Sequence, residues 1–394
     1  MYHYFLRMIG NTQWQRAKTA SGKIIAVYLF LAALQIAAPC QVVREAKGKM
    51  AVAGAGEAAR DRELASLFAP TFYQGLGDHR RADYVTNFDF DGDWRGDNNW
   101  EHADDLRFPL RAFVYYAVSE TVTHYFIHYA VFHPRDYKGG GRRGPLLSEA
   151  IKEGVRRGGK YDPTGLSAVV VLAHENDMEG CLVVVAKNGT DPRRAKVELI
   201  ETLSHDRFLK YVTEESLVTG FERVAVKSNK PQLYIEPKGH GISAYAAGKQ
   251  QLPGGGLMVY QFAGVAGNPE EAKDDQIGYD LIPLFTTLWP RAMKGINQTY
   301  GATRNYKFLG VGVRRAGRVQ KRKINLTVGS AFLGRVGASN MARPPWGWFD
   351  RDERESLHGE WFFEPAKTVK RHFNLANDFS LEYMYAPFLG VTGK

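Results

Sequence analysis

The sequence predicts a mainly β protein, with a β-sandwich or jelly-roll core, long decorated loops and a few short helices. Aromatic and β-branched residues recur in short apolar runs bounded by glycine, proline or polar residues, which is typical of strands. The chain holds 41 glycines, 20 tyrosines and 22 phenylalanines, a composition that favours strands and turns over a helical bundle. Segments with helical periodicity are few. The alternative is two α+β domains that meet near residue 265, where GVAGNPEEAKDD is typical of a linker.

The first forty residues differ from the rest of the chain. Four basic residues are their only Lys, Arg, Asp or Glu, and the charge-free run IIAVYLFLAALQIAA (residues 24–38) follows them. A basic start, an apolar run and small residues at its end are typical of a signal peptide. The run is shorter than the roughly 20 apolar residues that a membrane span needs. We therefore expect a signal peptide at 1–40 and a protein that is secreted or held in the cell envelope. A retained anchor is the alternative, and lipidation at Cys40 fits poorly because Pro39 precedes it.

The mature chain is expected to be a monomer with one domain. Small residues at 41–60 indicate a flexible tether, and 61–394 is expected to form a single β-sandwich domain with an aromatic C-terminal extension. A hydrophobic content of 44% is enough for a large core, and no disulfide framework exists because the chain has only two cysteines. The formal charge of +10 falls when the basic leader is removed. The mature protein is then mildly basic, so nucleic acid is not an expected partner.

The elements follow one another in a clear order. A short helix is expected at 63–70 (ELASLFAP), followed by two adjacent aromatic strands at 108–120 and 123–134. A glycine-rich basic loop at 138–160 leads to two apolar runs, SAVVVLA (167–173) and CLVVVAK (181–187). The other expected strands are 196–201, 232–237, 256–262, 306–313 and 323–334, and the other expected helices are 206–215 and 368–377.

The polar stretch HENDMEG, residues 174–180, lies between the two apolar runs. Burying uncompensated charge costs several kcal/mol, so such a cluster is normally paired, exposed or bound to a cation. In an extended chain Asp177 and Glu179 share a face, and His174 joins them if the chain turns at Glu175 and the residue after it. An imidazole with two or three carboxylates suits Mg²⁺, Ca²⁺, Mn²⁺ or Zn²⁺. The alternative is a polar hairpin tip whose acids pair with arginines.

A second group of polar residues accompanies the aromatic strand THYFIHYAVFHPRDY, residues 123–137. His124 and His128 share one strand face, where a histidine is usually a hydrogen-bonded core residue. His133 and Asp136 come just past the expected end of the strand, where rigid scaffolds carry their sites. Asp136 is therefore the better candidate for function.

These residues resemble the necrosis- and ethylene-inducing peptide family. The shared pattern is an aromatic strand ending near an acid, then a loop, then H-x-x-D-x-E leading into an apolar strand. Proteins of that family are secreted cytolysins with a β-sandwich core, in which a GHRHDWE heptapeptide lies in a divalent-cation site that receives a sphingolipid sugar headgroup. The resemblance implies a divalent cation, calcium or magnesium, held by Asp136, His174, Asp177 and Glu179. This sequence departs from the heptapeptide at two positions, and its intervening loop is longer.

A second likeness is to the vacuolar protein sorting-associated protein 62 family, with its D-W-E strand and later P-x-x-Y…H-G-H segment. Here ENDMEG is followed by KPQLYIEPKGHGISAY, which makes Glu236 and His240 the counterparts of the second segment. Both likenesses rest on short motifs within residues 108–245. They imply that Glu236 and His240 lie near the cation and its ligand.

The stretch NFDFDGDWRGDNNWE resembles a calcium loop. Asn87, Asp89 and Asp91 occupy the first three ligand positions, Gly92 the sharp turn, and Asp93 offers its backbone carbonyl. The twelfth position lacks the bidentate glutamate of an EF-hand. The alternative is an Asp/Gly turn whose polar groups are satisfied within the turn.

Tryptophans stand beside acids at 343–353 (RPPWGWFDRDE) and 359–365 (GEWFFEP). Sugar-binding surfaces combine these residue types, so Trp346, Trp348 and Trp361 are ligand-binding candidates. The alternative is that they fasten a C-terminal loop to the sandwich. Six basic residues at 313–323 (VRRAGRVQKRK) indicate either a solvated hairpin or a contact with anionic lipid or polysaccharide.

Three functions fit these patterns. The first is a secreted, cation-dependent protein that binds a glycan or a lipid headgroup, with peripheral membrane contact. The second is a metal-dependent hydrolase in which the cation activates water and His240 or His133 is the general acid or base. The third is an extracellular structural module without catalysis, in which HENDMEG is a salt-bridged hairpin. The sequence contains neither G-x-S-x-G nor H-E-x-x-H, motifs of common hydrolases.

Overall fold

Strands dominate the computed structural model, which describes residues 55–77, 79–136, 174–250, 254–293, 295–335, 342–353 and 358–392. The expected signal peptide, most of the tether, the whole basic loop and the SAVVVLA run lie outside these residues. The expected helix at 63–70 is confirmed, but it begins earlier, at Ala55, inside the segment expected to be a tether. In the described part of the chain, no helix combines the length and the apolar character that crossing a membrane requires.

The strands are β1 (Thr71–Gly75), β2 (Phe113–Thr121), β3 (His124–Asp136), β4 (His174–Ala186), β5 (Lys196–Leu203), β6 (Phe208–Val212), β7 (Glu222–Arg223), β8 (Val226–Lys227), β9 (Lys230–Ile235), β10 (Ile242–Ala244), β11 (Leu257–Phe262), β12 (Gln276–Pro283), β13 (Thr303–Arg315), β14 (Arg318–Gly329) and β15 (Tyr383–Tyr385). The α-helices are α2 (Ala55–Leu67), α3 (Asn99–His102), α6 (Leu288–Ala292), α7 (Glu360–Phe363) and α8 (Pro365–His372). Short 3-10 turns are η1 (Arg80–Asp83), η3 (Pro192–Arg194), η4 (Pro269–Glu271), η5 (Ile296–Gln298), η6 (Pro345–Gly347) and η7 (Pro387–Leu389).

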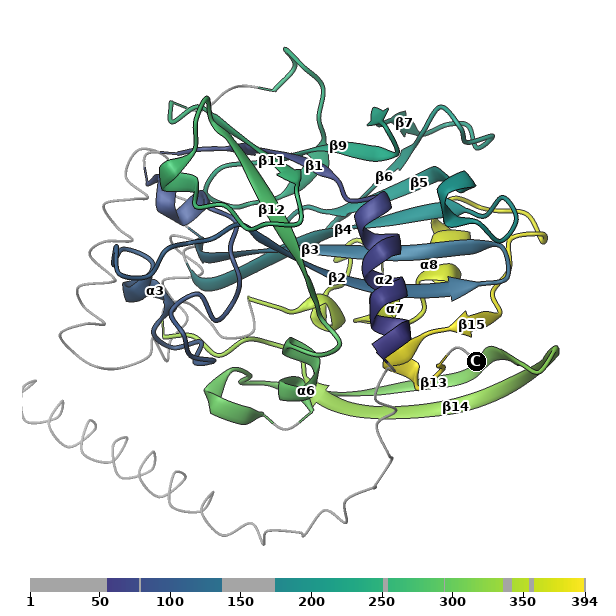
Figure 1. The fold of residues 1–394 in the computed structure, drawn as a ribbon. Helices are drawn as coiled ribbons and strands as arrows, with labels where there is room; N and C mark the ends of the chain where they lie inside the picture. Colours follow the sequence, from purple (N-terminus) through teal and green to yellow (C-terminus); the bar gives the residue numbers. More distant parts are fainter. Residues whose placement is uncertain are drawn as a thin grey trace, which may run out of the picture. The chain divides into compact units, whose positions relative to one another are not determined.

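The mainly β class with a few short helices is confirmed. The strands join into one mixed sheet whose main path runs β10-β9-β1-β11-β12-β2-β3-β4-β5-β6-β7, and the sheet curls into a half-barrel (Figure 1). Strands β11 and β12, on either side of residue 265, are hydrogen-bonded neighbours. The curl lets both arms of the sheet share one core, so the sandwich-like core is built within a single sheet.

The central strands β3 and β4 are buried on both faces. Ile127 and Val183 belong to a core cluster inside the curl, which also receives β1, β9, β11 and α2. Phe126 and Leu182 belong to a second cluster on the other face, covered by the β13–β14 hairpin and the C-terminal segment. Burial on both faces explains why the run CLVVV shows no alternation of apolar and polar residues.

Two expectations about element bounds were wrong. Residues 206–215, expected to be a helix, contain β6, which pairs with β5 from Leu199↔Val212 to Leu203↔Phe208. The strand β3 does not end at residue 134 but continues to Asp136, so His133 and Asp136 both lie within it. Its pairing partner β4 begins at His174, so HENDMEG belongs to a strand and is not a hairpin tip.

Candidate functional site

The HENDMEG residues form the first half of β4 and lie beside the end of β3. The antiparallel register pairs Asp136 with His174, His133 with Asp177, and Val131 with Glu179. Opposed residues in such a pair have Cβ atoms only about 5 Å apart. The strand pairing therefore brings together the two segments that the sequence singled out separately.

Asn176 adopts a backbone conformation that breaks the alternation of β4. Its φ is 65°, in the left-handed region that asparagine tolerates better than most residues. A regular strand would place His174 and Asp177, three residues apart, on opposite faces. With the turn at Asn176, one ligand atom each from Asp136, His174 and Asp177 lies within 4.8 Å of the other two. The turn expected next to Glu175 is thus present, and His174 joins Asp177 as expected.

The side chain of Asn176 holds this turn in place. Its buried amide donates hydrogen bonds to the carbonyl oxygens of Gly96 (2.5 Å) and Leu333 (2.7 Å). Its side-chain oxygen accepts a hydrogen bond from the amide of Asn99 at 2.6 Å. Glu175 turns away from the cluster and accepts hydrogen bonds from the backbone N–H groups of Trp100 and Arg335. It does not join the other acids.

Glu179 lies on the same strand face as Asp177. Its Oε1 accepts a hydrogen bond from the backbone N–H of His205 (3.1 Å), and its Oε2 is buried without a hydrogen-bond partner among the described residues. Burial, and then the negative charge of Asp177, raise the pKa of the Glu179 carboxyl well above its usual range. An unsatisfied buried carboxylate oxygen is costly, and a cation is one way to satisfy it.

The carboxylate of Asp177 is positioned by His240. The His240 Nδ1 lies 2.8 Å from Oδ2 of Asp177, and its Nε2 lies 3.2 Å from Oδ1 of Asp83. Burial alone lowers the pKa of His240, but the hydrogen bonds to Asp177 and Asp83 outweigh it and raise the pKa to about 10. Burial raises the pKa of Asp177, but the hydrogen bond to His240 and nearby imidazoles outweigh it, so the net pKa is lowered. Asp177 is therefore a fixed carboxylate.

His133 is stacked on His240, with ring centroids 3.7 Å apart and ring planes 6° from parallel. Its Nε2 lies 3.0 Å from the side-chain oxygen of Gln74, and its Nδ1 is buried without a hydrogen-bond partner among the described residues. Burial and the charge of His240 lower the pKa of His133 well below its usual range. His133, Asp177 and His240 form a second group whose ligand atoms lie within 4.8 Å of one another.

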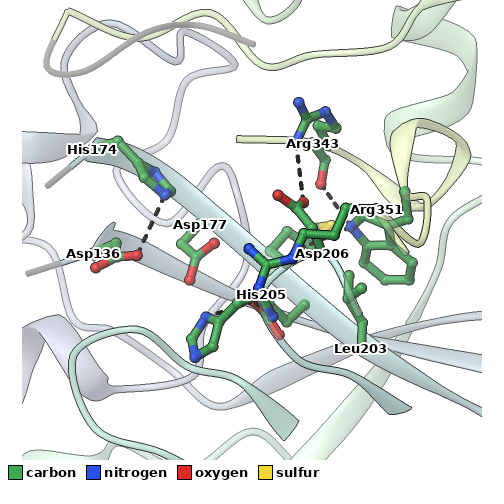
Figure 2. A pocket seen from close by; sticks show the side chains of 11 residues that line it. Asp136, His174, Asp177, Leu203, His205, Asp206, Arg343 and Arg351 are labelled. Carbon is green, nitrogen blue, oxygen red and sulfur yellow. Dashed lines mark hydrogen bonds and ion pairs between the residues drawn. The ribbon is translucent and has the colours of Figure 1, made fainter. Parts of the chain in front are cut away.

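A pocket of about 190 Å³ lies over the first cluster. Figure 2 shows Asp136, His174 and Asp177 at one end and Arg343 and Arg351 at the other. The wall contains Asp136, His174, Asp177, Met178, Glu179, Leu203, His205, Asp206, Arg343, Trp348 and Arg351. His205 also forms an ion pair with Glu236, which does not itself line the pocket, so a ligand-binding role for Glu236 stays a prediction.

The donor set at the acidic end fits a divalent cation. Among the described residues, no lysine or arginine forms an ion pair with Asp177 or Glu179, whose contacts are with histidine side chains and a backbone N–H. Two carboxylates and an imidazole, from Asp136, Asp177 and His174, are ligands of a hard or borderline cation such as Ca²⁺, Mg²⁺, Mn²⁺ or Zn²⁺. Glu179 lines the same pocket but is not part of this cation-sized group. The salt-bridged alternative needs arginines beside these acids, and Arg135, which is close to them on β3, pairs with Asp104 at 2.7 Å.

The expected calcium loop contains its own hydrogen bonds. Asn87 donates to Asp89 (2.9 Å), and Asp91 accepts from the backbone N–H of Asp93 (3.1 Å) while its other oxygen lies 2.5 Å from Nδ1 of His102. The two cation-sized groups found among the described residues do not include this loop. These contacts fit the alternative, an Asp/Gly turn whose polar groups are hydrogen-bonded within the turn. Calcium binding at this loop stays a prediction.

Of the three tryptophans, only Trp348 reaches the pocket. Its ring N–H lies within hydrogen-bond distance of the carbonyl oxygens of Met178 (3.0 Å) and Arg343 (3.1 Å). Trp346 and Trp361 are 0% and 1% exposed and belong to the outer core cluster. Such burial does not fit an exposed sugar-stacking role for Trp346 and Trp361. It fits the alternative, in which they fasten the C-terminal segment to the sheet.

Sequence reasoning missed several residues of the site. Asp83 comes from η1, His205 and Asp206 from the β5–β6 turn, and Arg343 and Arg351 from the C-terminal segment. The dipeptide His205–Asp206 was the only local signal, because histidine and an acid stand together in a turn between two apolar strands. The others carry no motif, since only the curl of the sheet brings them here.

No family model matches the chain, and no curated protein matches it in sequence. Several solved structures are similar to it in structure. One, described as a toxin fold for microbial attack and plant defense, is 14% identical with a TM-score of 0.26, over 48% of this chain and 71% of that chain. The protein NLPPya in complex with glucosamine is 15% identical with a TM-score of 0.26, over 49% and 71%.

Necrosis and Ethylene inducing Protein 2, from the causal agent of cocoa's witches' broom disease, is 13% identical with a TM-score of 0.26, over 48% of this chain and 71% of that chain. The likeness to the vacuolar protein sorting-associated protein 62 family stays a prediction. The chain is thus similar in structure to necrosis- and ethylene-inducing proteins, at low identity and over about half of its length.

Proposed function

We propose that this protein is secreted and uses a divalent cation, calcium or magnesium, to bind a glycan or a lipid headgroup. Asp136, His174, Asp177 and Glu179 would hold the cation. The observation that carries the proposal is the convergence of ligand atoms from the first three residues within 4.8 Å at one end of a pocket. The buried Oε2 of Glu179, which has no hydrogen-bond partner within the described ranges, supports it.

The pocket reaches the surface and is small. The side chains of His205 and Asp206, which line it, are 28% and 42% exposed. Its volume of about 190 Å³ is below the roughly 300–1,000 Å³ of drug-sized ligand sites, so it suits one sugar ring or one headgroup and not a longer chain. A bound cation would supply coordination positions for ligand hydroxyls, while Arg343, Arg351 and Trp348 form the opposite wall.

The geometry does not favour the hydrolase alternative with His240 or His133 as the acid–base group. Both are 0% exposed, and neither lines the pocket. Both ring nitrogens of His240 are engaged by carboxylates, and its pKa of about 10 keeps it from exchanging a proton near neutral pH. These two residues are better suited to positioning Asp177 than to catalysis.

Calorimetric titration of EDTA-stripped protein with Ca²⁺, Mg²⁺, Mn²⁺ and Zn²⁺ tests the proposal. The variant Asp177→Asn with Glu179→Gln should lose one binding site. The matched control is Glu214→Gln with Glu222→Gln, which removes the same charge at exposed positions. Glycan and headgroup binding should then require the cation in the wild type and fail in the site variant. Identical titrations for all three proteins would refute the cation site.

A further inference from the structure

The β13–β14 hairpin has one buried face and one solvent-exposed face, called the bare face below. Figure 1 shows it as a long green ribbon, with β14 on its outer side. Among the described strands, β14 pairs only with β13, so it is an edge strand there. The inner face packs through Tyr306, Phe308, Val311 and Val313, each no more than 4% exposed.

The bare face combines positive charge with exposed apolar side chains. The register pairs Leu309 with Lys323 and places Lys321 and Val319 further along the same face, past a bulge between Leu309 and Val311. Leu309 is 79% exposed and Val319 44%. Lys307, two residues before Leu309, points the same way and is also exposed.

No acid balances this charge within the hairpin. Residues 303–329 contain eight lysines and arginines and no aspartate or glutamate. Among the described residues, Arg314 pairs with Glu382, and the other seven basic side chains form no ion pair. The face is therefore electropositive.

Protecting an edge strand explains only part of this composition. Lysines on an edge strand prevent pairing with another chain, but exposed leucine and valine between them work against that purpose. Basic residues among apolar ones are instead what an anionic bilayer surface attracts, since the charges meet acidic headgroups and the apolar side chains enter the interface. An anionic polysaccharide would use the charges and gain nothing from Leu309 and Val319.

We propose that the bare face of this hairpin, formed by Lys307, Leu309, Val319, Lys321 and Lys323, docks on anionic lipid bilayers. The contact is peripheral, and it is independent of the cation pocket. It goes beyond the proposed function because it needs neither the cation nor the headgroup ligand.

The test is binding of the exported protein, without the expected signal peptide and in EDTA, to vesicles of phosphatidylcholine and phosphatidylserine in equal parts, and to pure phosphatidylcholine. The variant Lys307→Gln, Lys321→Gln, Lys323→Gln should bind the anionic vesicles about a hundredfold more weakly, since each charge near such a surface contributes about fivefold. The control Arg194→Gln, Lys227→Gln, Lys249→Gln removes equal charge from exposed positions and should bind as wild type does.

A second variant separates lipid from polysaccharide. Leu309→Gln with Val319→Gln should weaken vesicle binding and leave heparin binding unchanged. Equal weakening by the control and hairpin charge variants, or no effect of the apolar variant on vesicles, would overturn the proposal. The Asp177→Asn, Glu179→Gln variant should bind these vesicles normally, so failure of one proposal does not imply failure of the other.

Discussion

Replacing Asn176 should disturb both the stability of the fold and the cation site. Asn176→Gly keeps a residue that tolerates a φ of 65° but removes all three side-chain hydrogen bonds. At about 1 kcal/mol net for each bond, the variant should lose about 3 kcal/mol in free energy of unfolding. Asn176→Ala should lose about 1–2 kcal/mol more, because an alanine Cβ disfavours the left-handed conformation.

Urea unfolding of the two variants measures these losses directly. They are large beside the about 5–15 kcal/mol that stabilises a typical domain. Asn176→Gly should also weaken cation binding, since the turn that unites His174 with Asp177 is less firmly held. A loss below about 1 kcal/mol in Asn176→Gly would show that the hydrogen bonds matter less than their burial implies. Equal losses in both variants would refute the backbone argument.

Three further outcomes follow from the geometry. Gly180→Ala should cost about 1–3 kcal/mol in unfolding free energy, because its Cβ would lie 2.4 Å from a backbone carbonyl oxygen of β3; unchanged stability would contradict the packing. Burial alone lowers the pKa of His372, but Glu201 and a second carboxylate outweigh it and raise the pKa from 6.5 to about 9. The resulting stabilisation of the fold, roughly 2–4 kcal/mol, is complete below pH 6.5 and is lost as the pH rises through about 9. In urea unfolding, His372→Gln should therefore flatten the dependence of the unfolding free energy on pH. Parallel pH dependences for the wild type and the variant would contradict this. His240→Gln should lower cation affinity in calorimetry by about tenfold or more, as losing a group that orients a ligand does; an unchanged affinity would show that Asp177 needs no such support.

Much of the fold could be predicted because strand patterns are local. The pair β3 and β4 combines aromatic and β-branched runs, and its burial on both faces removes alternation without hiding the strands. The segment with β6 misled the interpretation because Phe208, Leu209, Tyr211 and Val212 also fit a helical spacing. This segment is a strand because it pairs with β5, and its local residue pattern gives no information about that pairing.

The candidate site was predictable only where two adjacent strands form it. Asp136 and the HENDMEG residues meet because β3 and β4 are neighbours, and the asparagine at 176 made a turn plausible. His240 was placed near them through a motif likeness, and its hydrogen bond to Asp177 agrees with that placement. Asp83 and Arg343 come from distant segments, which reach the pocket through long-range packing that sequence spacing does not encode.

The most direct test of the cation site is a crystal soaked in Mn²⁺, with anomalous difference density recorded at the manganese edge. We expect a strong peak among Asp136, His174, Asp177 and Glu179, and no such peak there in the Asp177→Asn, Glu179→Gln variant. A wild-type crystal with no peak in this pocket, or with a peak only at the Asn87–Asp93 loop, would contradict the proposed cation site and the ligand binding that depends on it.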